Sequence, residues 1–324
     1  MLLRIILKHL RTARQPLLVL VGPTASGKTD LSLSIAEGLR AQGRGVEIIN
    51  ADSRQLYRHL NIGTGKIRFE EMHDIPHHLF DVLDPKEEVT AAWYKREAER
   101  VIAEIHARGN IPFLVGGSML YVSAVIDNRA FVETPDPALR QELEKELQQN
   151  GADVLHRRLQ KLDPEGALGV DPMNAVYLLR ALEVCLSTGM CLKEAKRKHP
   201  SSYDLFILGI NPPRATLCRR IDERVRAMFK AGWAEEVQSL LDRGYTRNDP
   251  GMRSHGYREI ADALLQCSVE TVKGDSALHE RIAASSRQYA KRQMTWWKHD
   301  SRIRWMSPSP GAPHHPLPGG EGRR

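Results

Sequence analysis

The sequence predicts an α/β fold in which helices flank a parallel sheet and an all-helical insertion interrupts the sheet. Short apolar runs, several of them rich in β-branched residues, alternate with segments of helical spacing, which is typical of a parallel sheet. The first run leads through a glycine-rich loop into a helix. Between residues 125 and 202 no strand pattern stands out. With 324 residues, of which 41% are hydrophobic, the chain is long enough for a sheet core and an insertion.

The strands are predicted from apolar runs bounded by turn-forming residues. In chain order, the predicted strands are 17–21, 46–49, 78–82, 111–115, 205–210 and a short final one at 302–306. The first helix is predicted over residues 29–39, because Leu31, Ile35 and Leu39 recur at helical spacing. Leucines of the insertion repeat this spacing, and the chain after residue 212 is predicted to be mainly helical.

Four kinds of segment are expected along the chain. Residues 1–15 are basic and amphipathic but lack serine and a cleavage-like site, so we expect a short N-terminal extension rather than a transit peptide. Residues 16–126 and 203–306 are expected to form the sheet-containing core, and residues 127–202 the helical insertion. The last segment, 307–324, is rich in proline and glycine, which predicts a disordered tail.

The glycine-rich loop fits the pattern G-x-x-x-x-G-K-[ST], and the strand before it and the helix after it indicate a P-loop. The fold class is therefore P-loop NTPase-like. Successive backbone N–H groups and the positive end of the helix bind phosphate in such a loop. Lys28 is expected on the terminal phosphates, and Thr29 is expected to help hold Mg²⁺. The predicted diphosphate-binding residues are Gly22, Pro23, Thr24, Ala25, Ser26, Gly27, Lys28 and Thr29.

Two polar residues follow other predicted strands. Asp52 comes after the second strand and so lies at the carboxyl edge of the sheet, where the P-loop opens and α/β proteins bind ligands. An acid there can bind metal, accept a proton or cap a helix, and its position alone does not decide among these roles. Ser118 follows Gly116 and Gly117 after the fourth strand, and its hydroxyl either caps a helix or faces the same cleft.

The amino-acid composition indicates which cellular compartment and which kinds of partner to expect. The net charge of +7 permits a nucleic-acid partner. The basic excess lies in the C-terminal third, because residues 211–305 hold 18 Lys/Arg and 12 Asp/Glu whereas residues 134–200 hold 10 of each. The apolar runs are too short to cross a bilayer, so no membrane partner is expected. Four cysteines form no C-x-x-C pair, which favours a reducing, cytoplasmic compartment.

Seven motifs follow one another along the chain: GPTASGKT, DSRQLYRHLNIGTGK, HHLFDVLDP, VGGSMLY, RALEV, GYREI and RQYAKRQMTWW. This ordered set resembles the tRNA dimethylallyltransferase (tRNA isopentenyltransferase) family over residues 17–306. The resemblance implies transfer of a prenyl group from dimethylallyl diphosphate to the exocyclic amine of the adenine just 3′ of the tRNA anticodon. It implies that the P-loop holds the diphosphate of this donor. We expect Mg²⁺ as cofactor, the anticodon stem-loop as partner, and a monomer.

The resemblance also implies roles for single residues. Asp52 matches the general base of the family, and with Lys28 and Ser118 it makes up the expected catalytic set. Thr24 is expected to contact the donor. Arg287 and Lys291 share a basic helical face, which is either solvated or grips the RNA backbone. The residues expected to contact tRNA are Asp52, Ser53, Arg54, Gln55, Ser118, Arg140, Arg180, Arg253, Arg287 and Lys291.

The sequence departs from the family pattern at three places. Ser118 stands where the family often has threonine, which retains the hydroxyl. Met173-Asn174 and Tyr177 stand where the family often has an Asn-Asp pair and an arginine, so one RNA- or diphosphate-contacting arginine is absent. His255 stands where the family usually has a small or aliphatic residue.

Three other functions share some of these features. A P-loop kinase of a small molecule needs a similar loop and acid, but no arginine-rich lid is evident to clamp a transferring phosphoryl group. An adenylate isopentenyltransferase would use the same donor with a free nucleotide. A non-enzymatic RNA-binding protein could keep the loop as a relic, although the intact Lys28, Thr29 and Asp52 argue against this.

Overall fold

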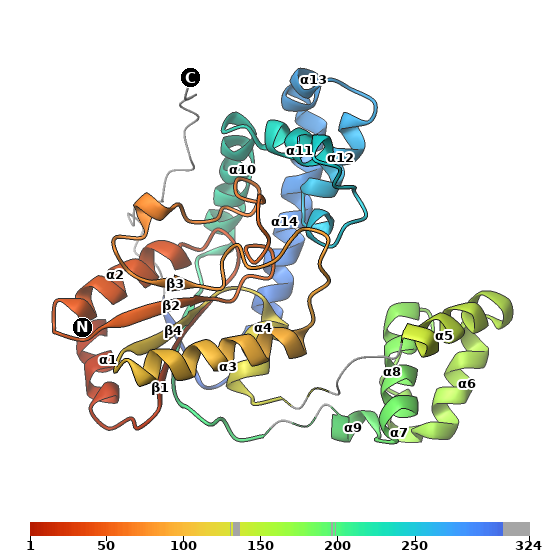
Figure 1. The fold of residues 1–324 in the computed structure, drawn as a ribbon, viewed down its shortest axis with the longest axis horizontal. Coiled ribbons are helices and arrows are strands. Elements are labelled where there is room, and N and C mark those ends of the chain that lie inside the picture. The colour runs from red at the N-terminus through yellow and green to blue at the C-terminus, as the bar shows by residue number, and fades with distance from the viewer. Residues whose placement is uncertain (130, 132–136, 196, 198, 307–324) are drawn as a thin grey trace. The chain divides into compact units, whose positions relative to one another are not determined.

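The computed structural model describes residues 1–129, 131, 137–195, 197 and 199–306 (Figure 1). The chain divides into two compact units. One consists of Met1–Val122 with Ser202–Arg324, and the other is Ser123–Ser201. Each unit is described separately below. The segment 307–324, which was expected to be disordered, lies outside the described residues.

The first unit is built on a six-stranded sheet in which every strand pairs parallel to its neighbours. Its order is β3-β2-β4-β1-β5-β6, so β1 lies at the centre between β4 and β5. The parallel, alternating arrangement that the sequence predicted is therefore confirmed. The strands are β1 (Pro16–Val21), β2 (Val46–Asn50), β3 (His77–His78), β4 (Ile111–Val115), β5 (Asp204–Ile210) and β6 (Ile303–Met306).

Helices cover both faces of this sheet (Figure 1). The helix α2 (Lys28–Arg40) follows β1 and packs against the sheet, with Leu33, Ile35 and Leu39 buried in a cluster that includes Leu18 of β1 and Phe113 of β4. The helix α3 (Ala91–Ala107) connects β3 to β4, which runs across the sheet in the direction opposite to the step from β1 to β2, and right-handed crossovers therefore place it on the other face.

The N-terminal residues contribute to the core, which differs from the expected extension. Residues Leu2–Leu10 form helix α1, and Ile6 and Leu10 are buried beside α2. After this helix, the backbone N–H groups of Arg14 and Gln15 donate hydrogen bonds to the Asp204 carboxylate at the start of β5. The amphipathic pattern of these residues is the pattern of a helix that packs on the domain.

The predicted strand at 78–82 is wrong beyond His78. Only His77 and His78 pair with β2. Leu79 and Asp81 have positive φ angles of 61° and 55°, a conformation that ends extended pairing and that non-glycine residues rarely adopt. The turn brings the Asp81 carboxylate to 2.6 Å from the buried Lys66 ammonium, and this ion pair accounts for the departure from the sheet.

The rest of the first unit is mainly helical, as predicted. In the last helix, α14 (Ser276–Trp297), Ala290 and Trp297 are buried, whereas Lys291 is exposed. The remaining elements are η1 (Phe69–Glu71), α4 (Met119–Ile126, where the two units divide), α10 (Arg214–Lys230), α11 (Trp233–Asp242), η2 (Gly251–Arg253), α12 (Tyr257–Leu264) and α13 (Val269–Gly274).

The second unit has its own core, and its described residues form no strand. Leu143, Leu155, Leu159, Leu178 and Leu182 are all fully buried in one cluster. The helical spacing of leucines in the insertion correctly predicted this arrangement. The helices are α5 (Pro137–Asn150), α6 (Ala152–Leu162), α7 (Pro164–Ala167), α8 (Ala175–Thr188) and α9 (Leu192–Ala195).

Candidate active site

The P-loop connects the end of β1 to the start of α2, as its sequence context predicted. Gly27 has a φ of 89° and is the N-cap residue of α2, a left-handed position that glycine adopts without strain. The Ser26 side chain is 2% exposed, and its Oγ atom has no hydrogen-bond partner among the described residues. A buried hydroxyl without a partner is costly, so an oxygen-rich ligand in this loop would satisfy it.

Lys28 lies inside the loop. Its ammonium donates to the carbonyl oxygens of Gly22 and Pro23, at 3.0 and 2.8 Å. Burial lowers the pKa of Lys28 to about 8, against the opposing effect of the Asp52 carboxylate; the charge of Arg224 lowers it further. A bound anion would favour the charged form of this lysine and raise its pKa again.

Two arginines that the sequence analysis did not identify face the same space. Arg220 and Arg224 lie one turn apart on α10, and both line a cavity of about 360 Å³ with the P-loop. Arg220 is only 9% exposed and has no ion-pair partner among the described residues. Arg224 donates to the Thr64 carbonyl at 3.3 Å. Lys28, Arg220 and Arg224 thus place three cationic side chains on this cavity, where they can bind a charged anion. Lys66, which pairs with Asp81, and the acids Asp30, Asp52, Glu71 and Glu223 complete its charged lining.

Asp52 lies in a turn after β2, and no helix begins there, so the helix-capping interpretation is wrong. Its Oδ1 atom accepts a hydrogen bond from the backbone N–H of Arg54 at 2.9 Å. Its own N–H donates to Asn50 Oδ1, also at 2.9 Å. The carboxylate is therefore held by its neighbours in a fixed turn. Asp52 lines the phosphate-loop cavity and also a second cavity of about 310 Å³.

Ser118 faces the second cavity rather than capping its own helix. Its Oγ atom accepts a hydrogen bond from the N–H of Ser53 at 2.8 Å, which joins the turn after β4 to the turn after β2. The preceding glycines allow this approach. A Cβ atom at Gly116 would lie 2.2 Å from the Ala51 backbone, and one at Gly117 would lie 2.3 Å from the Gln293 amide.

Gln293 of α14 is a third residue that the motif analysis missed. It is 1% exposed, its Oε1 atom accepts from the Thr24 N–H at 2.9 Å, and its Nε2 atom donates to the Gly117 carbonyl at 2.8 Å. One buried amide thus ties the P-loop to the turn that carries Ser118. The residue belongs to the motif RQYAKRQMTWW, but nothing in that motif indicates which distant backbone groups it contacts.

The second cavity differs in character from the first. Its walls combine polar side chains, among them Ser53 and Arg54, with aromatic and aliphatic ones. The two cavities share Thr24, Ala25, Asp52, Thr64 and Arg224. Asp52 therefore stands where the P-loop cavity meets a space lined by rings and apolar groups. The large aromatic and aliphatic lining residues are Met119, Leu120, Tyr121, Ile221, Val225, Met228, Trp233 and Tyr289.

The other residues predicted to contact tRNA fall into two groups, those that line a cavity and those that do not. Gln55 donates to the carbonyls of Thr64 and Gly65 and lines the first cavity. By contrast, neither Arg253 nor Arg287 is among the described residues that line the two cavities. Arg253 lies 3.1 Å from Glu88, and Arg287 is held by Asp222 and Glu280. Lys291 is exposed and lines neither cavity.

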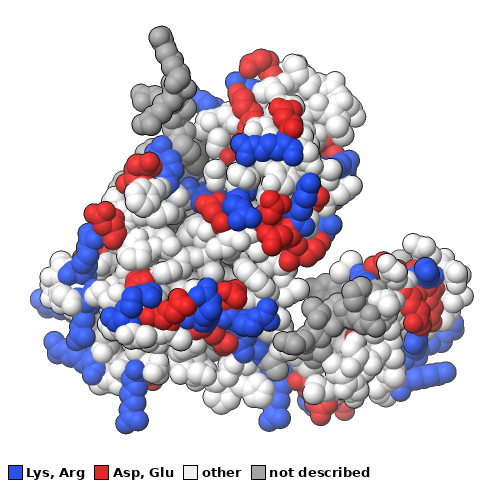
Figure 2. Space-filling model, viewed as in Figure 1, with Lys and Arg blue, Asp and Glu red and all other residues white. Residues whose placement is uncertain are grey.

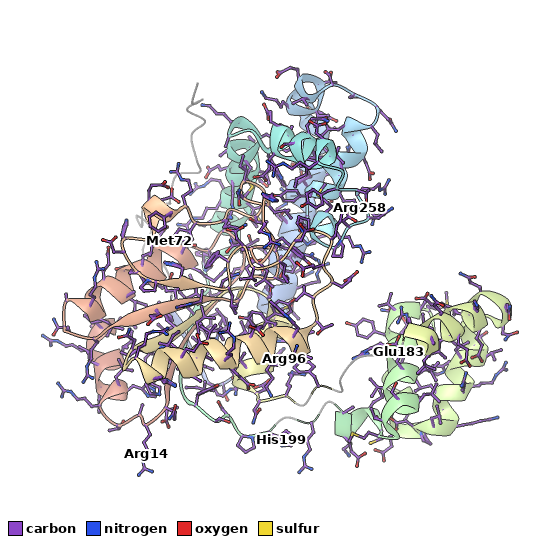
Figure 3. All side chains as sticks on the ribbon, in the orientation of Figure 1. Arg14, Met72, Arg96, Glu183, His199 and Arg258 are labelled. Carbon is purple, nitrogen blue, oxygen red and sulfur yellow. The ribbon has the colours of Figure 1, made fainter. Side chains whose placement is uncertain are left out.

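The predicted arginines of the helical unit share one carboxylate. Glu183 of α8 (Figure 3) is 2% exposed and lies 2.9 Å from Arg140 and 3.2 Å from Arg180. Asn174 caps this helix by accepting from the Tyr177 N–H at 3.3 Å. On the face in Figure 2, basic and acidic side chains are interspersed rather than gathered into one patch of a single sign.

Comparisons with known proteins place the chain in a family. Residues 55–300 match a model of the family described as IPP transferase. The chain is 42% identical to a tRNA dimethylallyltransferase of Geobacter sulfurreducens, over 91% of this chain and 92% of that protein. It is 37% identical to a tRNA dimethylallyltransferase of Bacillus subtilis, over 93% of each chain. The chain belongs to the IPP transferase family.

Solved structures of IPP transferases agree with this assignment and confirm the predicted fold class. The full-length tRNA isopentenylpyrophosphate transferase from Bacillus halodurans is 37% identical, covers 91% of this chain and 90% of its own, and gives a TM-score of 0.64. A eukaryotic dimethylallyltransferase, solved acting on tRNA, is 27% identical, covers 90% of this chain and 74% of its own, and gives a TM-score of 0.77.

Proposed function

We propose that this chain transfers a dimethylallyl group from dimethylallyl diphosphate to the exocyclic amine of the adenine 3′-adjacent to the anticodon in tRNA, releasing diphosphate. One observation carries the proposal together with family membership: Asp52 lies at the junction of the two cavities. A donor held by its diphosphate in the first cavity can thus meet an acceptor base in the second, with a carboxylate between them.

The first cavity suits the diphosphate. Lys28, Arg220 and Arg224 supply positive charge, and the unpartnered Ser26 hydroxyl and the backbone N–H groups of the loop supply donors. Negative charge builds on the diphosphate oxygens as the allylic carbon–oxygen bond breaks, and these groups stabilise it most when that charge is greatest.

A magnesium ion fits this arrangement only together with the donor. The described residues contain no cluster of three or more His, Cys, Asp or Glu side chains able to hold a metal. Mg²⁺ commonly binds substrate phosphates with one or two protein oxygens and water, and Thr29 at the start of α2 lines the cavity as one such oxygen. When bound, the ion would help neutralise the leaving diphosphate.

Asp52 is proposed as the general base. The exocyclic amine of adenine is a weak nucleophile because its lone pair is delocalised into the ring. Its nitrogen attacks the allylic carbon, the carbon–oxygen bond to diphosphate breaks, and Asp52 takes the amine proton as the new bond forms. Ser118 and Ser53 position the turn that carries this carboxylate, through the hydrogen bond between them.

RNA binding is proposed for residues outside the two cavities as well. Arg140 and Arg180 of the helical unit, and Arg253, Arg287 and Lys291 of the first unit, would contact phosphates of the anticodon stem-loop, and such contacts fix register. Arg140 and Arg287 are the weakest of these candidates, because two carboxylates already hold each guanidinium.

We also propose the compartment and the oligomeric state in which the enzyme works. Its four cysteines are free, which suits a reducing cytoplasm where tRNA is modified. We propose that the enzyme acts as a monomer. Among the described residues, no helix is both long and apolar enough to cross a membrane.

The test is to map the product. Incubation with dimethylallyl diphosphate carrying a labelled prenyl group and with unmodified tRNA, followed by nuclease digestion and mass spectrometry, is expected to place one dimethylallyl group on the amine of the adenine 3′ to the anticodon. A label found at another position, or on phosphate or protein only, would overturn the proposal. Recovery of labelled mononucleotide only with added AMP would favour the adenylate isopentenyltransferase.

A further inference from the structure

The second cavity contains a histidine that the proposed reaction has not used. His255 lies between η2 and α12 and lines the cavity together with Asp52 and Ser118. Its Nδ1 atom is 3.1 Å from the Ser285 hydroxyl of α14. The other ring nitrogen, Nε2, has no hydrogen-bond partner among the described residues. The residue retains contact with solvent, although neighbouring groups screen its ring from part of the water, and it lines a cavity rather than a packed core.

The neighbours of this imidazole fix its ring. Its centroid lies 5.2 Å from that of Tyr289, whose hydroxyl hydrogen-bonds to Ser118. The Arg292 guanidinium lies 5.7 Å from the centroid of the same tyrosine ring. With Ser285, these groups form a wall from α14 against which the histidine rests. An oriented ring with one unused nitrogen is suited to hydrogen-bond a ligand in the cavity.

The histidine is expected to be neutral when it meets the substrate. Loss of hydration lowers the pKa of His255, and the nearby charges of Arg54 and Arg292 lower it further, against the carboxylates of Glu259 and Asp52. A neutral imidazole offers one hydrogen-bond donor and one acceptor. With Nδ1 occupied by Ser285, the available group is Nε2, either as an N–H donor or as an acceptor.

We propose that His255 is a specificity-determining residue that reads the acceptor adenine by a hydrogen bond from or to its Nε2 atom. This inference rests on the proposed function, because it places the acceptor base in the second cavity. The exocyclic amine of adenine lies between N1 and N7, so a base whose amine faces Asp52 presents one of these two nitrogens to nearby groups in the cavity. His255 is one such group, and aliphatic residues at this position could not make the contact.

Steady-state kinetics on an anticodon stem-loop test the proposal. His255→Val is expected to raise KM for the stem-loop by about fivefold to tenfold, the size of one neutral hydrogen bond. KM for dimethylallyl diphosphate should stay within about twofold of wild type. His299→Val, at an exposed histidine after α14 that lines neither cavity, is the matched control and should leave both constants unchanged.

Two conservative variants separate base reading from a structural role. A glutamine amide reaches the position of Nε2, whereas an asparagine amide reaches that of Nδ1. His255→Gln should therefore restore the stem-loop KM to within about threefold of wild type. His255→Asn should behave like His255→Val. The reverse order, with asparagine restoring KM and glutamine not, would show that the contact with Ser285 is what matters and would overturn the proposal.

Modified acceptors locate the contact on the base. Stem-loops with 7-deazaadenine or 1-deazaadenine at the acceptor position each lack one ring nitrogen. Each analogue is tested with wild-type protein and with His255→Val. For one of the two analogues, the combined loss in kcat/KM should be smaller than the product of the two separate losses, because the analogue and the substitution remove the same hydrogen bond. If the combined loss in kcat/KM equals the product of the separate losses for both analogues, the inference is overturned while the proposed function stays intact. If wild-type protein fails to prenylate the unmodified stem-loop, the proposed function itself fails.

Discussion

Lys28→Ala is expected to abolish prenyl transfer while leaving tRNA binding nearly intact. The ammonium sits inside the P-loop and lines only the first of the two cavities. Removing one pre-oriented positive charge that stabilises a developing anion lowers the rate by about a hundredfold to a thousandfold. In this site the same positive charge also holds the donor. The measurements are kcat/KM for dimethylallyl diphosphate and, separately, the Kd for tRNA by filter binding.

The pKa of Lys28 supplies a control for this prediction. Because burial lowers that pKa to about 8, the lysine is charged at lower pH and loses its proton as the pH rises through this value. Donor affinity in the wild type should therefore fall above about pH 8. Lys28→Arg keeps a charge at all these pH values and should lose the dependence. If Lys28→Ala instead weakens tRNA binding strongly, the division of roles between the cavities is incorrect.

Asp52→Asn is expected to lower the rate of prenyl transfer by about a hundredfold or more, within the range for a general base. Asparagine retains an oxygen that can accept the Arg54 N–H, so the turn should persist and KM for the donor should change little. Single-turnover transfer from labelled donor to stem-loop measures the chemical step. Asp74→Asn, the same change on an exposed loop outside both cavities, is the matched control.

A normal single-turnover rate in Asp52→Asn would contradict the role as base and leave Asp52 a purely structural residue of the turn. Thermal melting of the two variants decides whether any loss comes from unfolding. Equal melting temperatures with a large difference in rate would attribute the loss to proton transfer.

Local chemistry explains why much of the site could be predicted from the sequence. The P-loop needs only a strand, a run of glycines and a helix in succession, so residues 22–29 specify their own conformation. Asp52 and Ser118 follow strands directly, and parallel strands bring such positions to one edge.

The residues that the sequence did not reveal depend on tertiary packing. Arg220 and Arg224 look like ordinary charges of a surface helix until α10 is placed beside the P-loop. Gln293 reaches two backbone groups that lie 269 and 176 positions away in the chain. The predicted strand after His78 failed because Asp81 forms an ion pair with Lys66, a contact that no periodicity encodes.

The enzyme is proposed to modify an adenine held within RNA. An adenine stacked in a loop must leave its stack to meet the donor, at a cost of a few kcal/mol. Phosphate contacts to the stem-loop would supply that free energy, and AMP brings none of them. The same contacts should make stem-loop affinity fall steeply with salt.

The most direct test compares an isolated anticodon stem-loop with AMP at equal concentration, using labelled dimethylallyl diphosphate and wild-type protein. The stem-loop should be prenylated at a rate close to that of whole tRNA, because all the proposed phosphate contacts are to the stem-loop itself. Transfer to AMP should be slower by about a hundredfold or more, the equivalent of a few kcal/mol of lost binding free energy. Equal rates on AMP and on the stem-loop would contradict the tRNA assignment and favour a free-nucleotide transferase.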